Sequence, residues 1–501
     1  MRRPGASWST ARTRVLALAA LAIVRLCACH ASGGPNAIQR ENALPASEAW
    51  QFWRGGDRVA DDAGGQIKGY ASATSVDHGE TITFHVSVTP PQSYTIEIYR
   101  IGWYGGAGGR LLTTLGALAG THQPDCPIDA TTGLIACEWA ASAEVQVPES
   151  WTTGVYLAVL RNAEHFASVV PFVVRDDAHP PALLYQQSVT TYQAYNLYPD
   201  DHLTGKSLYG SSYGPPTISG GTRAVAVSFD RPYAGDGAGD FLKWEVHFIR
   251  WLERAGYDVG YSTDLDTHQH GEQLRASKAF LVVGHDEYWS REMFDAVEAA
   301  RDGGVHLGFF GANAAFWQVR FSPSASGARD RIMTCYKDAQ LDPVQGPTTT
   351  VNWRSPPVDR PEQRLIGVQY SDVIAGGISG AYADYVVVSS ASWVYADTGF
   401  TNGSVVHGIL GYETDRFHPE FPAPTAIQGS HVFLSASSFS NFAGQPARST
   451  ASIYQAPSGA WVFAAGTIGW SLALDDFLDR TVADPRIQRT TANLLDAFTR
   501  G

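Results

Sequence analysis

Positive charge is scarce in this sequence. Its 501 residues include 36 Lys and Arg against 49 Asp and Glu, which gives a formal net charge of -13 at pH 7. Several arginines stand before Cys27, and no acidic residue precedes Glu41, so removal of that N-terminal segment would leave a still more acidic chain. An acidic surface repels the phosphate backbone of nucleic acids. We therefore expect no nucleic-acid partner.

Long apolar runs are scarce as well. The clearest one, "VLALAALAIV" at residues 15–24, follows a stretch rich in arginine and is too short to span a bilayer. A charged stretch followed by a short apolar core is typical of an export signal. The next residues, "LCAC" at 26–29, are close to a bacterial lipobox, whose final cysteine is acylated. We predict an exported protein: a cell-envelope lipoprotein attached to the membrane through Cys29, or a secreted or periplasmic protein after plain cleavage.

Cysteine is rare, with 5 in the whole chain. Cys126 and Cys137 flank a polar turn between predicted strands, so in an oxidising compartment we expect them to form a disulfide. Two free thiols are the alternative for this pair. Cys335 is then unpaired, and we expect it to be buried.

Motifs of the common nucleophilic and zinc hydrolases are missing. No G-x-S-x-G sequence stands between a predicted strand and a predicted helix, and H-E-x-x-H is absent. Cys335 has no evident base near it in the sequence. The sequence therefore does not support a serine or cysteine nucleophile, nor a zinc site of the H-E-x-x-H kind.

The composition that remains, 44% hydrophobic and 17% charged, is that of a folded globular protein, and the length favours more than one domain. Residues 48–176 contain segments of alternating apolar and polar residues, such as "ETITFHVSV" and "YTIEIYRI", which are typical of an immunoglobulin-sized β-sandwich. In residues 182–501 short apolar runs alternate with helix-length segments, which indicates an α/β domain with a mostly parallel sheet. A signal peptide (1–29), a tether (30–47) and a proline-containing linker (175–181) complete the predicted organisation.

Polar residues follow several apolar runs of the predicted α/β domain. Ligands bind at the carboxyl ends of strands in open parallel sheets, so these residues are candidates for a site at one sheet edge. In chain order they are Tyr192, Tyr195 and Asn196; Asp230, Arg231 and Tyr233; His285, Asp286 and Glu287; Asn313; and Glu413.

The tripeptide His285-Asp286-Glu287 is the most informative of these. It follows the apolar run "AFLVV" directly, and burial of three ionisable groups without partners would cost several kcal/mol. Carboxylate and phenol oxygens beside a histidine suit a hard, ferric-type ion better than zinc. The tripeptide therefore points to a functional site at the end of this strand.

The sequence around this tripeptide resembles the large (beta) subunit of N,N-dimethylformamidase and its bacterial relatives. The motifs that carry the resemblance are "GHDEYWSREMFDAVEAARDGGVHLGFFGANAAFWQVRF", "SFDRPY", "AYN...GKSLY", "GYETDR" and "YQAPSGAWVFAAGTIGWSLALD". The resemblance implies a glutamine-amidotransferase-like α/β fold, and "GYASATSV...YRIGWYGGAGGR" resembles the β-sandwich that precedes it in many members.

The resemblance also implies a site. In that enzyme two tyrosines and a glutamate bind one iron ion, which places the glutamate on Glu287, one tyrosine on Tyr233 and the other on Tyr195, with Tyr192 as the alternative. The catalytic candidates, which line the pocket or move protons, are His285, Asn313 and Glu413.

The implied function is iron-dependent hydrolysis of a small-molecule C–N amide bond. The formamidase is cytoplasmic and works with a small partner subunit, so we expect such a subunit or a homo-oligomer, whereas the export signal is a departure from that enzyme. The alternative is a non-catalytic cell-surface protein that binds a ligand or glycan on the same fold.

Overall fold

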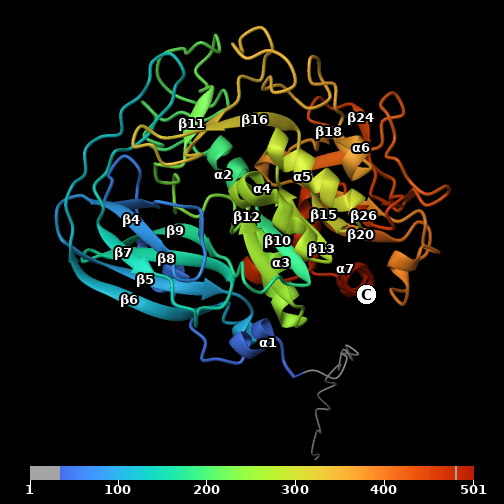
Figure 1. Cartoon of the computed structure of the whole chain (residues 1–501), viewed down its shortest axis with the longest axis horizontal. Coiled ribbons are helices and arrows are strands. Elements are labelled where there is room, and N and C mark those ends of the chain that lie inside the picture. Colours follow the sequence, from blue (N-terminus) through green and yellow to red (C-terminus); the bar gives the residue numbers. More distant parts are fainter. Residues whose placement is uncertain (1–33, 480–481, 501) are drawn as a thin grey trace, which may run out of the picture. The chain divides into compact units, whose positions relative to one another are not determined.

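A computed structural model describes residues 34–479 and 482–500 (Figure 1). The predicted export signal and the candidate lipidation site Cys29 lie outside the described residues. The chain divides into two units, Met1–Pro35 and Asn36–Gly501, and the account below concerns the second unit. The sequence predicted a mixed α/β protein, and that prediction is confirmed: strands in several sheets greatly outnumber helices.

Two sheets lie in the N-terminal part of this unit. The larger has the order β1 (Arg58–Val59), β9 (Phe166–Val174), β8 (Gly154–Asn162), β5 (Ser93–Ile101) and β6 (Gly109–Ala119), with β3 (Ser75–Val76) beside β9. The smaller consists of β2 (Ile67–Ala71), β4 (Thr81–Val88) and β7 (Ala143–Gln146). Alternate residues of β4 and β5, including Phe84 and Ile98, are fully buried in one core to which both sheets contribute. The alternation seen in the sequence thus defines the face that each strand buries.

A seven-stranded sheet organises the rest of the unit (Figure 1). Its order is β12 (Val259–Thr263), β10 (Leu183–Gln187), β13 (Ala279–His285), β15 (His306–Ala312), β26 (Trp461–Ala464), β25 (Ser452–Gln455) and β22 (Val432–Phe433). The strands from β12 to β26 pair in parallel, and β25 and β22 are antiparallel additions. Every residue of β13 is buried, which explains its unbroken apolar run.

The helices pack around these sheets. They are α1 (Ala37–Asn42), α2 (Val189–Tyr195), α3 (Glu245–Arg254), α4 (Asp264–His270), α5 (Arg291–Asp302), α6 (Gln363–Ile366) and α7 (Pro485–Thr499). Ser290 caps α5 by accepting a hydrogen bond from the backbone N–H of Met293 over 3.2 Å. No helix in the described part of the chain is long and apolar enough to cross a bilayer.

Smaller sheets cover the site end of the large one. One has the order β11 (Ala226–Ser228), β17 (Ile332–Thr334), β16 (Trp317–Ser322) and β14 (Tyr288–Ser290); the others pair β18 (Gln369–Val373) with β21 (Glu413–Arg416), β19 (Ala383–Val386) with β20 (Val405–Leu410), and β23 (Ser437–Ser440) with β24 (Pro446–Ser449). The expectation that all five candidate-bearing runs belong to one parallel sheet is therefore wrong. β11 pairs antiparallel with β17, and β20 pairs antiparallel with β19.

Contacts join the N-terminal sheets to the rest of the unit. Arg100 of β5 and Glu253 of α3 form an ion pair of 2.7 Å in which neither side chain is exposed. Residues predicted as part of a tether contribute as well, because α1 forms there and Glu41 accepts hydrogen bonds from Tyr104 and Arg110, both over 2.6 Å. The boundaries of the predicted domains stay a prediction.

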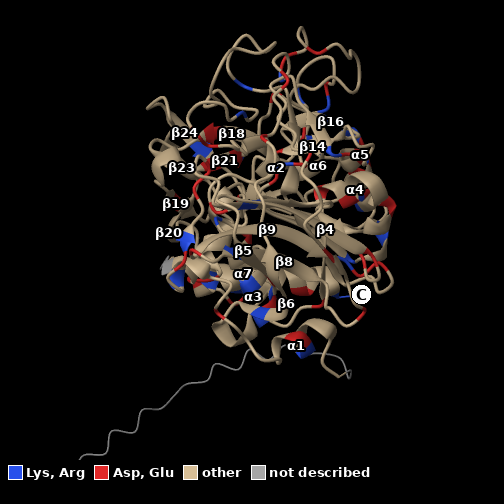
Figure 2. Ribbon diagram, turned by 90° about the vertical axis from the view of Figure 1, so that its left-hand side faces the viewer, with Lys and Arg blue, Asp and Glu red and all other residues tan. Residues whose placement is uncertain are grey.

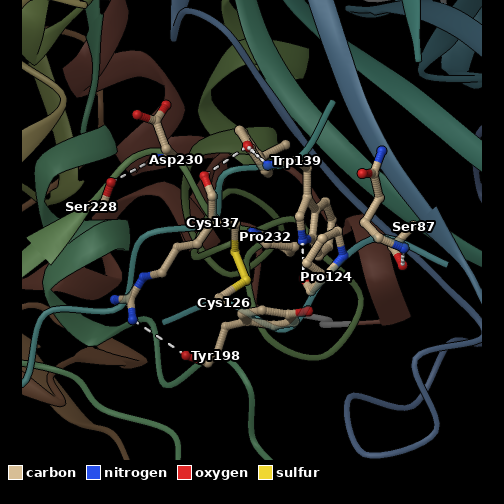
Figure 3. Close-up of a disulfide and its surroundings, with 12 residues drawn as sticks. Ser87, Pro124, Cys126, Cys137, Trp139, Tyr198, Ser228, Asp230 and Pro232 are labelled. Carbon is tan, nitrogen blue, oxygen red and sulfur yellow. Dashed lines mark hydrogen bonds between the residues drawn. A yellow bond between two sulfur atoms is a disulfide. The ribbon is translucent and has the colours of Figure 1, made fainter. Parts of the chain in front are cut away.

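A disulfide joins Cys126 and Cys137 (Figure 3), and Cys335 is free and buried, as expected. The backbone N–H of Cys137 donates to the carbonyl of Asp230 over 2.6 Å. Within the hairpin, Thr131 and Thr132 accept hydrogen bonds from the backbone of Ile218 and Val225, both over 2.8 Å. The disulfide-closed hairpin, residues 126–137, therefore supports the segment that leads into β11.

Charged residues are distributed without a basic stripe. Figure 2 shows Lys and Arg scattered singly among Asp and Glu across the elements in view. This distribution fits the acidic composition of the chain.

Candidate active site

The candidate site begins where β13 and β15 end side by side. Gly284 has a φ of 69°, and a Cβ on Gly311 would lie 2.2 Å from the carbonyl oxygen of Gly284. Glycine at both positions lets the two strands approach closely. His285 is the last residue of β13, and Asn313 follows β15 with a φ of 54°. The parallel register therefore brings these two side chains to the same edge.

Glu287 accepts hydrogen bonds from two tyrosines. The hydroxyl groups of Tyr195 and Tyr209 each donate to Oε2 of Glu287 over 2.9 Å. Tyr195 is the last residue of α2, and Tyr209 lies in the loop that leads toward β11. The two rings stack with centroids 4.1 Å apart. Glu287 is only 3% exposed, so two phenols and one carboxylate share a buried position.

A second group of side chains adjoins Glu287. Nε2 of His285 lies 3.3 Å from Oε2 of Glu287 and 3.1 Å from Oε2 of Glu413. The amide nitrogen of Asn313 donates to the same Glu413 oxygen over 2.7 Å. Glu413 is the first residue of β21, which reaches this edge from outside the large sheet. The predicted residues Tyr195, His285, Glu287, Asn313 and Glu413 are thus brought together.

Three further residues, Tyr209, Tyr288 and Lys337, belong to the cluster and were not predicted. Nζ of Lys337 donates to the hydroxyl of Tyr288 over 2.7 Å, and that hydroxyl donates to the hydroxyl of Tyr209 over 2.6 Å. Nζ of Lys337 also lies 3.7 Å from the centroid of the Tyr209 ring. Lys337 follows β17, which belongs to a smaller sheet. An argument from the strand ends of the large parallel sheet therefore could not place Lys337 here. Tyr209 stands in the "GKSLY" motif, which was the available signal for it.

The electrostatics of the cluster favour an ionised Glu287. Burial opposes ionisation, but the hydrogen bond and charge of His285 and the charge of Lys337 hold the pKa of Glu287 below its ordinary value. Burial and the neighbouring Glu287 charge raise the pKa of Tyr195 and of Tyr209 well above the usual range. Both phenols are therefore protonated donors to a carboxylate.

Burial also lowers the pKa of Lys337, to about 8, against the opposing charge of Glu287. His285 responds in the opposite direction. Burial disfavours its charge, but Glu413 and Glu287 together raise the pKa of His285 well above the ordinary value. An imidazolium between two carboxylates is the result.

The other two tyrosine candidates have different partners in the structure. Tyr192 donates its hydroxyl to Oε1 of Glu245 on α3. The ring of Tyr233 packs against that of Tyr192 with centroids 6.1 Å apart and lines a small cavity with Arg331. β11 pairs antiparallel with β17 in a smaller sheet, so Tyr233 does not follow a strand of the large parallel sheet.

The remaining strand-end candidates have structural partners. Asp286 accepts a hydrogen bond from Gln186 over 2.7 Å, Asn196 donates to the carbonyl of Pro232 over 2.8 Å, and Asp230 pairs with Arg331 at 2.8 Å. None of these contacts reaches Glu287. They build the walls around the site.

The donor set at Glu287 fits a hard cation. In the described residues no group of three or more His, Cys, Asp or Glu is arranged to hold a metal ion, so a set without tyrosine does not form. Two phenol oxygens already converge on one carboxylate oxygen, and such oxygen ligands suit iron in its ferric state. Nearby, Oδ1 of Asn313 and Nδ1 of His285 are buried without a hydrogen-bond partner among the described residues. The residues present are therefore compatible with the group that the resemblance implies.

Fold and site together define a mixed α/β protein with a buried tyrosine–carboxylate centre. The family model described as "N,N-dimethylformamidase beta subunit-like, C-terminal" matches residues 95–484. The chain belongs to this family.

One curated relative is the N,N-dimethylformamidase beta subunit of Alcaligenes sp., which is 26% identical over 224 residues. That alignment covers 37% of this chain and 29% of the relative, so the chain spans less than a third of the length of the protein it matches. Among solved structures, a Paenibacillus sp. cycloisomaltooligosaccharide glucanotransferase matches 66% of this chain and 62% of its own, with 10% identity and a TM-score of 0.17. A score this low says nothing about the fold of this chain.

Proposed function

We propose that this chain is an exported, iron-dependent hydrolase that cleaves the C–N bond of a small, non-peptide amide. The observation that carries the proposal is that the Tyr195 and Tyr209 hydroxyls both lie 2.9 Å from one Glu287 oxygen. A purely structural carboxylate does not require two stacked phenols at one oxygen. Membership of the formamidase family supports the same reaction class.

Tyr195, Tyr209 and Glu287 would hold the iron ion. When bound, the ion would supply Lewis acidity for the amide carbonyl and for a water molecule. Lys337 supports this role because it neutralises part of the negative charge that two phenolates and a carboxylate bring together. Tyr209 replaces Tyr233 in the set inferred from the resemblance.

His285 and Glu413 would move the proton. Hydrolysis forms a carbon–oxygen bond from water, breaks the C–N bond and transfers one proton from the water to the leaving nitrogen. Glu413 accepts that proton and returns it to the amine, while His285, 3.1 Å from Glu413, stabilises the ionised carboxylate before the first transfer and after the second. Since the amide nitrogen of Asn313 is committed to Glu413, Asn313 orients this carboxylate instead of binding the developing oxyanion.

The test is elemental analysis and visible absorption of the purified protein. We expect about one iron per chain and a tyrosinate-to-iron absorption band, both lost in Glu287→Ala. The matched control is Glu245→Gln, a buried glutamate that bonds to Tyr192 outside the cluster and should leave both signals intact. Equal iron in the wild-type protein and Glu287→Ala, or none in either, would sink the proposal.

The finer architecture and setting are part of the same proposal. The two N-terminal sheets, with their common core, support an immunoglobulin-like sandwich, and the parallel strands from β12 to β26 support a glutamine-amidotransferase-like domain. The disulfide between Cys126 and Cys137 supports export, with lipidation at Cys29 or plain cleavage as the two routes. The Alcaligenes sp. relative is a beta subunit, which supports a small partner subunit or a homo-oligomer here.

A further inference from the structure

Arg231 is a buried cation without an acidic partner. It is 1% exposed, and the carboxylate next to it in the sequence, Asp230, is already paired with Arg331. No carboxylate in the described part of the chain lies within ion-pair distance of Arg231. Burial lowers the pKa of its guanidinium group to about 9. An uncompensated buried charge is costly, so its contacts must matter for the structure around it.

All four of its hydrogen-bond acceptors are neutral oxygens. Nε donates to the side-chain oxygen of Gln193 over 3.1 Å, and Nη2 donates to the carbonyl of Asn196 over 2.9 Å. Nη1 donates to the carbonyls of Lys206 over 2.9 Å and of Tyr198 over 3.3 Å. Every acceptor belongs to the segment 193–206.

These acceptors bracket the two tyrosines of the site. Gln193 and Asn196 stand on either side of Tyr195, and Lys206 precedes Tyr209 by three positions. Between the bracketed points, the backbone N–H of Leu208 donates to the carbonyl of Ala194 over 2.9 Å, so both ends of the loop also meet directly. The guanidinium group of Arg231 thus connects the end of α2 to the part of the loop that contains Tyr209.

We propose that Arg231 is a positioning residue that holds Tyr195 and Tyr209 in register on Glu287. This inference rests on the proposed function, since the register matters for iron binding only if iron is bound there. Arginine suits the role because its planar fork presents five donors in fixed directions, whereas lysine presents a compact ammonium on a flexible stem. Tyr195 and Tyr209 are separated by the loop 196–209, and the hydrogen bonds of Arg231 cross-link the two ends of this loop.

The variant that tests this is Arg231→Lys, with Arg331→Lys as its matched control. Arg331 is also buried, but its hydrogen-bond acceptors are Asp230, Ala71 and Phe229. None of these acceptors lies in the segment 193–209, which contains the two site tyrosines. Two measurements are compared: backbone hydrogen exchange of residues 196–210 in iron-free protein, followed by mass spectrometry, and the affinity for ferric iron against a competing chelator.

We expect Arg231→Lys to speed exchange in residues 196–210 and to weaken iron binding by about 10–100-fold, with a shifted tyrosinate band. Arg331→Lys should change neither. Unchanged exchange in 196–210, or an unchanged iron affinity despite faster exchange, overturns the positioning role. A wild-type protein that binds no iron overturns the proposed function itself, and the positioning role with it.

Arg231→Lys could fail to fold, so a milder variant is included. Gln193→Met removes one of the four acceptors and leaves the arginine in place. We expect it to weaken iron binding in the same direction but by a smaller factor. Affinity equal to that of the wild-type protein in Gln193→Met, together with unchanged exchange in 196–210, would also overturn the inference.

Discussion

Tyr195 and Tyr209 stack ring on ring, 4.1 Å between centroids, and share one carboxylate oxygen of Glu287. Fourteen positions of chain separate them, so the loop between them must turn back for the rings to meet. This relationship distinguishes the site from an ordinary buried carboxylate. It also decides which tyrosine substitutions are informative.

Tyr209→Phe should abolish the tyrosinate-to-iron band or shift it strongly, because it removes one of the two phenol oxygens at Glu287. Tyr233→Phe should leave the band unchanged, since the Tyr233 ring packs against Tyr192 instead. Visible absorption of the iron-loaded proteins is the measurement. A band that survives in Tyr209→Phe but disappears in Tyr233→Phe would show that the set inferred from the resemblance was the correct one.

Glu413→Gln should lower kcat by about 10²–10⁴-fold while the iron content stays close to that of the wild-type protein. Glutamine can keep the contact with Asn313 but cannot accept a proton from water. Activity is measured on a panel of small formamides and acetamides. The control is Asp372→Asn on the neighbouring strand β18, whose carboxylate accepts a hydrogen bond from Asn441 over 2.8 Å. A Glu413→Gln enzyme with full activity would exclude this residue as the proton carrier.

The sequence predicted the part of the site that depends on local pattern. An unbroken apolar run, followed by Gly284 and then by His285 and Glu287, indicated a buried strand with polar residues at its carboxyl end. β13 has that form. Tyr209 and Lys337 could not be found in this way. The first lies in a loop, and the second follows a strand of another sheet, so only tertiary pairing brings them to Glu287.

Tyr233 shows what an apolar run does not reveal about the pairing of its strand. "AVAVSFD" has the apolar character of a buried parallel strand, but its central residues form β11, which pairs antiparallel with β17. Apolar composition reports burial and says nothing about the neighbouring strand.

Loss of the disulfide should destabilise the hairpin 126–137 and, through it, the segment that leads into β11. Cys126→Ser combined with Cys137→Ser should lower the free energy of unfolding by about 2–4 kcal/mol. Because the hairpin carbonyls accept from Ile218 and Val225, hydrogen exchange should increase at those two amides. Cys335→Ser is the control for thiol loss elsewhere. Unchanged exchange at Ile218 and Val225 would show that the hairpin does not support this segment.

Glu245 should make the stability of the protein depend on pH. Burial raises the pKa of its carboxyl group from 4.5 to about 8, despite hydrogen bonds from Tyr185 and Tyr192 that favour ionisation. Between these values the unfolded chain releases a proton that the folded protein keeps, so this group lowers the free energy of unfolding as pH rises from about 4.5 to about 8. Below 4.5 both states are protonated, and above 8 both are ionised, so the dependence ends there.

Glu245→Gln removes this group from the titration. The difference in unfolding free energy between variant and wild-type protein should grow in favour of the variant across that pH window, by an amount on the order of a few kcal/mol. Chemical denaturation at a series of pH values measures it. A difference that stays constant from pH 4.5 to 8 would contradict the raised pKa.

The buried pair of Arg100 and Glu253 should couple the N-terminal sheets to α3 more strongly than an exposed pair could. Glu253 also accepts hydrogen bonds from Asn42 and Tyr261, each over 2.8 Å, so its carboxylate remains buried with donors if the arginine is lost. Arg100→Met should cost about 3–5 kcal/mol, because it leaves one charge without its partner. The double variant Arg100→Met with Glu253→Met should cost less than the sum of the two single changes, since it leaves no charge unpaired. If the losses in unfolding free energy of the two single variants add up to that of the double variant, the ion pair contributes no coupling. Apolar packing alone would then join β5 to α3.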